Sequence, residues 1–182
     1  MATKNTTSAR LLQDFERYIQ GNRNIFICLG IFLHNPGMMF SILYRIQRYL
    51  QFHTVFIFRL VGYVCYPMYF FLTYYIFSYH IEPDVEIEGG LYLHNRPIDI
   101  TNATKIGRNV SIMGGVTIGT GFEHNHFDIT IGDNVRIGTG AKIIAKGTLS
   151  ITHDVTIGAN SVVVKDIKSS GVYAGVPVKR IR

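Results

Sequence analysis

Three histidines, His94, His124 and His126, lie where a regular aliphatic pattern of this chain is interrupted. Histidine titrates close to neutral pH, so a neutral imidazole can take a proton from a hydroxyl group near pH 7. Insertions in a repetitive chain are extruded as loops, and such loops often carry function. A metal site at His124 and His126 is poorly supported, because no third ligand lies nearby at a recognisable spacing. We therefore expect acid–base chemistry and no metal.

The aliphatic pattern repeats every six residues from Ile81 onward. A β-strand alternates with a period of two, so an ordinary β-sandwich does not explain this spacing. A six-residue period is typical of a parallel β-helix, in which each step is a short strand and a corner. Three steps complete one coil, which gives about four coils up to residue 163. The aliphatic positions are Ile81, Ile87, Leu93, Ile100, Ile106, Ile112, Ile118, Ile131, Ile137, Ile143, Ile151, Ile157 and Val163.

The chain divides into two regions of different composition. Residues 1–80 hold only four of the 18 glycines, and they predict a basic, apolar, α-helical region. Helices are expected at residues 10–20 and 38–51, with a turn at residues 34–37. Residues 81–182 form the predicted β-helix domain. The fold class is thus mainly β, with a small helical region in front.

The stretch Leu60–Tyr79 contains no formally charged residue and is long enough to span a bilayer. Its six tyrosines and Pro67 argue against a span, because tyrosine prefers membrane interfaces. Three interpretations remain: a packed helix at the second domain or a subunit interface, a helix lying on a membrane, and a true span. The first region carries seven basic and two acidic residues, which favours an anionic membrane surface or an acidic partner.

Composition excludes several classes of protein. The chain is 47% apolar and 16% charged, which excludes a disordered or fibrous protein. Its two cysteines, Cys28 and Cys65, exclude a disulfide scaffold and a cysteine-rich zinc site, and they suit a reducing compartment. No dinucleotide-binding, phosphate-loop or nucleic-acid module is present. The polar start lacks the features of a signal peptide, so we expect a cytoplasmic protein, either free or at the inner face of the cytoplasmic membrane.

Several stretches of the sequence resemble the hexapeptide-repeat acyltransferases, in particular serine acetyltransferases and bacterial polysaccharide O-acetyltransferases. The resemblance implies a left-handed β-helix, a homotrimer or a dimer of trimers, and acetyl-CoA as co-substrate. It is strong over residues 81–182 and weaker over residues 34–50. The stretches that carry it are Ile131–Ile143, Ile157–Asp166, Ala174–Lys179, Gly114–Gly121 and Tyr44–Ile46.

The resemblance implies roles for the histidines. His94 would be the general base, at a corner one residue shorter than the family's. In the family an aspartate orients the base, but His80 occupies that position here. Another acid (Glu82, Asp84 or Asp99) or a backbone carbonyl would then orient His94. A second histidine, donated across the trimer interface, would be His126 or His124, with His126 slightly favoured.

The resemblance also implies a groove for coenzyme A. Small residues would line the pantetheine arm, and basic residues near the end of the chain would meet the coenzyme phosphates. The implied residues are Gly119, Gly121, Thr139, Ala159, Lys165, Lys179 and Arg180.

The acceptor is expected to be a hydroxyl group of a saccharide in a capsule, O-antigen or exopolysaccharide, or of its precursor. The basic, tyrosine-rich first region favours this interpretation, because envelope polysaccharides are built at the cytoplasmic membrane face. The alternative is serine O-acetylation in cysteine biosynthesis, for which a fixed acid should hold the ammonium group. A non-catalytic β-helix scaffold is a minor alternative.

Overall fold

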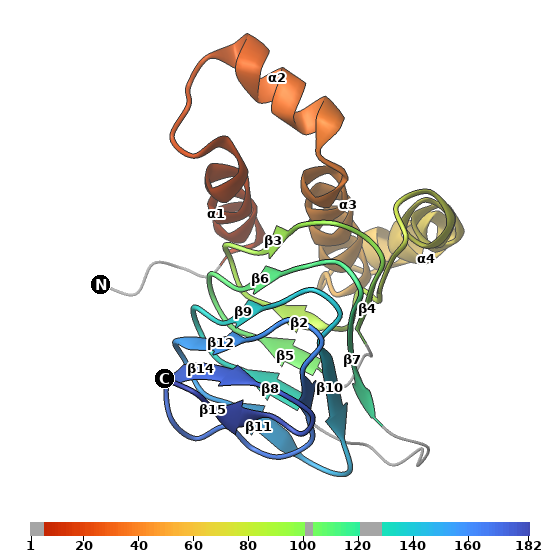
Figure 1. The fold of residues 1–182 in the computed structure, drawn as a ribbon. Helices are drawn as coiled ribbons and strands as arrows, with labels where there is room; N and C mark the ends of the chain where they lie inside the picture. The colour runs from red at the N-terminus through yellow and green to blue at the C-terminus, as the bar shows by residue number, and fades with distance from the viewer. Residues whose placement is uncertain (1–5, 101–103, 121–128) are drawn as a thin grey trace.

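The computed structural model describes residues 6–100, 104–120 and 129–182. Helices occupy the first part of the chain and stand at one end of a stack of short strands (Figure 1). The helical elements are α1 (Thr7–Ile19), α2 (Ile25–His34), α3 (Pro36–Gln51), α4 (Phe56–Phe70) and the π-helical turn η1 (Phe71–Ile76).

The strands form three sheets, and the chain passes from one sheet to the next at each corner. All pairings are parallel except that of the last two strands. This arrangement confirms the predicted parallel β-helix. The first sheet holds β1 (Tyr79–Ile81), β4 (Ile98–Ile100), β7 (Val116–Thr120), β10 (Lys142–Ala145) and β13 (Val162–Val163). The second holds β2 (Glu86–Ile87), β5 (Thr104–Ile106), β8 (Ile129–Ile131) and β11 (Leu149–Ile151). The third holds β3 (Tyr92–Leu93), β6 (Ser111–Ile112), β9 (Arg136–Ile137), β12 (Val155–Ile157), β14 (Gly171–Ala174) and β15 (Lys179–Arg180).

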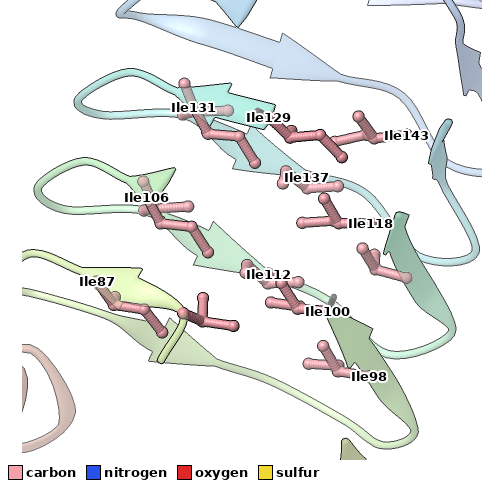
Figure 2. Packing of buried hydrophobic residues seen from close by; sticks show 14 of the residues in the cluster. Ile87, Ile98, Ile100, Ile106, Ile112, Ile118, Ile129, Ile131, Ile137 and Ile143 are labelled. Carbon is pink, nitrogen blue, oxygen red and sulfur yellow. The ribbon is translucent and has the colours of Figure 1, made fainter. Parts of the chain in front are cut away.

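The six-residue pattern places its aliphatic side chains inside the β-helix. All thirteen predicted positions are buried, and none is more than 3% exposed. The ladder aligns equivalent positions of successive coils, so that Leu93, Ile112 and Ile137 follow one another along one sheet. Figure 2 shows the resulting stack of isoleucines in the interior. The prediction of the core from sequence spacing is confirmed.

Asparagine and aspartate shape one row of corners. Asn109, Asn134 and Asp154 have positive φ angles of 57°, 59° and 55°, a conformation that most side chains resist. Their side chains also form a ladder, in which Asn109 donates to Asn134 (3.3 Å) and Asn134 donates to Asp154 (3.0 Å). Asn and Asp at these positions therefore suit the left-handed backbone of the corner.

The helices differ from their predicted limits for local reasons. Helix α1 begins at Thr7 because the Thr6 hydroxyl caps its first turn. The predicted turn at residues 34–37 is reduced to Asn35, since α2 ends at His34 and α3 already begins at Pro36. Asn35 caps α3 through its side chain, and proline fits the first position of a helix. Helices α2 and α3 are bent by 88° at this point.

The first coil of the β-helix has no coil above it, and the helices bond to its open edge. Tyr69 of α4 donates to the carbonyl of Ile81 (2.7 Å), and Tyr44 of α3 donates to that of Val85 (2.5 Å). Further donations run from Arg48 to Pro83 (2.6 Å), from Arg45 to Ile87 and Glu88 (2.5 and 2.6 Å), and from Arg17 to Gly90 (2.8 Å). Side chains of the helical region thus satisfy backbone groups that the β-ladder leaves unpaired.

Asp14 is the centre of this contact. It is 1% exposed and forms an ion pair with Arg45, which is equally buried. Its carboxylate also accepts hydrogen bonds from the backbone N–H groups of Gly90 (2.7 Å) and Leu91 (2.8 Å). The same carboxylate therefore joins α1, α3 and the strand that leads to His94.

Replacing Asp14 with alanine is expected to destabilise the protein by about 3–5 kcal/mol, because it leaves the Arg45 charge buried without its partner. Urea unfolding of the purified variant measures this loss. The matched control is Glu16→Ala, which removes an exposed carboxylate from the same helix. Equal stability of the two variants would contradict the role of Asp14.

Two helices leave a large apolar surface exposed. No residue of α2 is buried, and in α4 only Gly62 and Tyr69 are. Within the described ranges, one helical stretch, Phe56–Ile76, is long and apolar enough to cross a membrane by length and composition. The predicted segment Leu60–Tyr79 differs from it at both ends, and Tyr79 instead opens strand β1.

Candidate active site

His94 lies at the corner between strands β3 and β4. Its backbone N–H donates to Ile112 of the next coil (2.9 Å), and its carbonyl accepts from the hydroxyl of buried Tyr79 (2.9 Å). The preceding residue, Leu93, donates its N–H to the hydroxyl of Tyr18 in α1 (2.9 Å). The backbone of this corner is therefore held by the next coil, by β1 and by α1.

The His94 side chain opens onto a cavity of about 420 Å³ on the outer face of the third sheet. The walls come from helix α1 and from four successive coils of the β-helix. They are lined by Arg17, Gln20, Tyr92, His94, Ser111, Met113, Arg136, Ile137, Gly138, Thr156 and Ile157. This cavity can hold a ligand beside the histidine.

Arg17, like Arg136, is a residue of this site that the sequence did not indicate. Arg17 makes several contacts there. Its guanidinium donates to the Gly90 carbonyl and to the Ser111 hydroxyl, both at 2.8 Å, and lies 5.7 Å from the centre of the Tyr92 ring. The available signal was helical spacing. Asp14, Arg17 and Tyr18 are three and four residues apart, so they share one face of α1.

The surroundings of His94 favour its neutral form. Desolvation lowers the pKa of His94, and the nearby Arg17 charge lowers it further. The Tyr92 ring packs edge-on against the imidazole at 4.5 Å. A neutral imidazole can accept a proton, which a general base requires.

The acids that the sequence offered as partners of His94 are placed elsewhere. Asp99 binds Nδ1 of His80. Glu82 lies beside Asp84, and desolvation followed by the Asp84 charge raises the pKa of Glu82. No hydrogen bond joins the His94 ring to a carboxylate within the described part of the chain. His80 occupies the position at which the family has its orienting aspartate. In this structure His80 is itself bonded to an acid, Asp99.

The residues implied for coenzyme A separate into groups. Thr139 and Ala159 follow the stacked glycines Gly138 and Gly158, and the Asn160 N–H donates to the Thr139 carbonyl (2.8 Å). A Cβ atom on Gly138 would lie 2.7 Å from the Ala159 nitrogen, so the close stacking of these coils requires glycine there. Thr139 and Ala159 therefore lie next to the cavity wall.

The other implied residues are not brought to this cavity. Gly119 lies in the first sheet, where it pairs with Ile144. Lys165, Lys179 and Arg180 are exposed, and none of them lines the cavity. Gly121, His124 and His126 lie outside the described residues.

Known proteins resemble this chain in sequence and in fold. No profile of a known protein family matches it. A serine acetyltransferase of Staphylococcus xylosus is 40% identical over 99 residues, which cover 53% of this chain and 45% of that protein. The solved structure of a Neisseria gonorrhoeae serine acetyltransferase in complex with serine has a TM-score of 0.78 and 25% identity, and covers 97% of this chain and 69% of that one. The solved structure of a Brucella abortus serine acetyltransferase in complex with coenzyme A has a TM-score of 0.76 and 25% identity. The match covers 96% of this chain and 67% of that one.

The chain has the β-helix fold of the serine acetyltransferase structures that it resembles. The resemblance implied a left-handed β-helix. The similarity in fold to these serine acetyltransferase structures confirms this prediction. The chain spans about half the length of the Staphylococcus serine acetyltransferase. The fold similarity extends through the helical region as well, because the Neisseria structure covers nearly the whole chain.

Proposed function

We propose that this protein is an acetyl-CoA-dependent O-acetyltransferase with His94 as its general base. The observation that carries the proposal is a histidine at the edge of a cavity in a β-helix like that of the serine acetyltransferases, with desolvation and the Arg17 charge lowering the pKa of this histidine. The His94 ring removes the proton of an acceptor hydroxyl, and the oxygen attacks the thioester carbonyl. The C–S bond then breaks, and the coenzyme A sulfur leaves and takes up a proton. Coenzyme A itself would lie along Gly138, Thr139 and Ala159.

L-Serine is the acceptor that the relatives favour. The Staphylococcus relative is named a serine acetyltransferase, and the Neisseria structure contains serine. In this chain the arginines Arg17 and Arg136 line the cavity and suit the serine carboxylate.

A saccharide hydroxyl is the second candidate, and one observation favours it. Among the described residues that line the His94 cavity there is no carboxylate that could hold an ammonium group. An amino-acid acceptor would bring such a charge into the site, where an unpaired charge is costly. A neutral sugar brings hydroxyl groups only.

An acceptor screen tests the proposal. The purified protein is incubated with acetyl-CoA and either L-serine or one of a set of saccharides, and the release of free thiol is followed. Thiol release that requires an acceptor, with acetyl ester found on that acceptor, is the expected result. An absence of acetylated product with every acceptor would overturn the proposed reaction.

The active assembly is proposed to be a trimer, or a dimer of trimers, in which the loop with His124 and His126 reaches a neighbouring subunit. Light scattering of the purified protein measures the oligomer. Variants of the loop histidines mixed with His94→Ala subunits should regain activity if the two histidines act across a subunit boundary.

Anionic membranes are expected to bind the helical region. Residues 17–81 contain no Asp or Glu, and α2 and α4 expose large apolar side chains such as Phe26 (81%) and Phe56 (74%). Apolar burial at the interface and attraction of arginines to anionic lipid would act together. Sedimentation with phosphatidylglycerol vesicles should be strong at low salt, partly reversed at high salt, and weaker with phosphatidylcholine vesicles.

The arginines that serve this attraction are fewer than the sequence suggested. Arg45 is buried against Asp14, and Arg48 donates to the Pro83 carbonyl, so neither is free to meet lipid. Arg23 and Arg59 are exposed. Replacing both with glutamine should weaken sedimentation, whereas the control Lys146→Gln on the β-helix should not. Failure of the unmodified protein to bind anionic vesicles would mean that the apolar surface serves subunit contact.

A further inference from the structure

A second cavity lies between the helices and the outer face of the first sheet, apart from the cavity of His94. Its volume is about 320 Å³. Figure 1 shows α4 beside the edge of the β-helix that carries β4 and β7. One wall consists of aromatic side chains from α4 and η1, namely Tyr66, Tyr69, Phe70 and Tyr74. The facing wall is polar and consists of His80, Glu82, Asp99 and Thr117.

The polar wall contains a histidine with its own acid. Nδ1 of His80 is bonded to the Asp99 carboxylate on the next strand of the sheet. Because a carboxylate accepts hydrogen bonds, His80 donates from Nδ1 to Asp99, and its Nε2 is not used by this bond. The two side chains remain 30% and 44% exposed, so a ligand can reach them. This pair is not used by the His94 site.

The aromatic wall holds the imidazole in place. The Tyr74 ring stacks on the His80 ring with their centres 3.9 Å apart and their planes 20° apart. Burial raises the pKa of Tyr66, and the charges of Glu82 and Asp84 raise it further, so this phenol keeps its proton and can donate. The wall therefore presents both flat apolar surface and hydroxyl groups.

The rest of the polar wall is also equipped for hydrogen bonds. Desolvation raises the pKa of Glu82, and the adjacent Asp84 raises it further. The Thr117 hydroxyl oxygen accepts a hydrogen bond from the Lys142 ammonium (2.8 Å), so the hydroxyl proton can still be donated to a ligand. Acceptors and donors thus alternate over a short distance.

The geometry points to a saccharide unit as the occupant of this cavity. A pyranose ring has an apolar C–H face and a rim of hydroxyl groups. The aromatic wall matches the C–H face, and the carboxylates, His80 and Thr117 match the hydroxyl groups. A pocket of this size with one apolar wall and a few convergent polar groups is typical of a small-molecule site.

Other ligand classes fit this cavity less well. A lipid chain would displace water from Nε2 of His80 and from the second carboxylate oxygen of Asp99, which the bond between the two side chains does not use, and this is costly. An anion, including the carboxylate of serine, would lie against Glu82 and Asp99. The carboxylates of Glu82 and Asp99 would attract an organic cation, and aromatic rings attract cations as well. An organic cation is therefore the competing occupant.

The cavity adjoins the corner that carries His94. Tyr79 lines the cavity, and its hydroxyl donates to the His94 carbonyl. A sugar unit bound here would lie against the first sheet, whereas the His94 ring faces the cavity of the third sheet, so only an acceptor saccharide of more than one unit would reach both. This acceptor role rests on the proposed O-acetyl transfer, whereas the binding of a sugar does not.

Binding is measured on the full-length protein without acetyl-CoA. The probes are the methyl glycosides of glucose, galactose, mannose and N-acetylglucosamine, with L-serine and choline as competitors of other classes. Chemical shifts of labelled protein report binding through the backbone amides of His80, Asp99 and Thr117. We expect at least one glycoside to shift them. Tyr74→Ala and Asp99→Asn should each weaken this binding about tenfold, the effect of one hydrogen bond or ring contact.

The matched control is Tyr63→Ala, which removes an exposed tyrosine of the same helix that does not line the cavity. Its glycoside affinity should equal that of the unmodified protein. The inference would be overturned if none of the four glycosides changed these chemical shifts, or if only choline or L-serine changed them. So would binding that survives both cavity variants. Acetyl transfer to L-serine with no sugar binding would overturn this inference alone, and sugar binding without any acetyl transfer would overturn only the proposed reaction.

Discussion

Replacing His94 with alanine is expected to slow acetyl transfer by about two to four orders of magnitude, the usual cost of removing a general base. The variant should remain folded, because the His94 side chain is exposed and the corner is held through its backbone. Steady-state kinetics with the acceptor identified in the screen measure the effect. Circular dichroism and light scattering check the fold and the oligomer.

His153→Ala is the matched control, because His153 is another exposed histidine of the β-helix and binds only its neighbour Asp154 among the described residues. The pH profile gives a second reading. A base works when deprotonated, so activity falls as the pH drops through its pKa. Because desolvation and Arg17 lower the pKa of His94, this fall should lie below the range of an ordinary histidine. Unchanged turnover by folded His94→Ala would refute the assignment.

Replacing Ile137 with aspartate is expected to prevent folding. Ile137 is 1% exposed and lies between Ile112 and Ile157 of the adjacent coils. A carboxylate without a partner in this apolar interior costs several kcal/mol, which is comparable with the whole stability of a domain. Expression of soluble protein and a thermal unfolding curve measure the outcome.

Ile137→Val is the control, since it removes one methyl group and should cost only about 0.5–1.5 kcal/mol. Ile112→Asp is expected to behave like Ile137→Asp, because the two side chains occupy the same position in successive coils. A soluble Ile137→Asp protein with a cooperative transition would show that this position tolerates a charge.

The repeat could be predicted because it is local. Each isoleucine of the pattern, from Ile81 to Ile157, faces inward for a reason that its own six-residue step contains. The same holds for Asn109 and Asn134, whose left-handed backbone is set by the corner in which they lie. The position of His94 at a corner follows from its place after Leu93.

The contacts around His94 and His80 could not be predicted from local sequence. Arg17 lies 73 residues before Gly90, the carbonyl of which it binds, and the sequence gives no sign of this pairing. Asp99 could have oriented His94 or bonded elsewhere, and only the parallel register of β1 and β4 places it opposite His80. The start of α3 at Pro36 depended on whether Asn35 would serve as a turn residue or as a cap. Such choices are made by contacts distant in sequence.

The helices that bond to the first coil also limit how the protein can polymerise. A stack of parallel coils resembles a short piece of a cross-β fibril, and an uncovered end would accept the next molecule strand by strand. At one end, Tyr69, Tyr44 and Arg45 occupy the carbonyls that such a neighbour would need. At the other end, β15 runs back antiparallel along β14 and breaks the parallel register. Removal of the helical region would therefore expose the backbone of the first coil, and because β15 still covers the other end, the expected product is an end-to-end dimer rather than a filament.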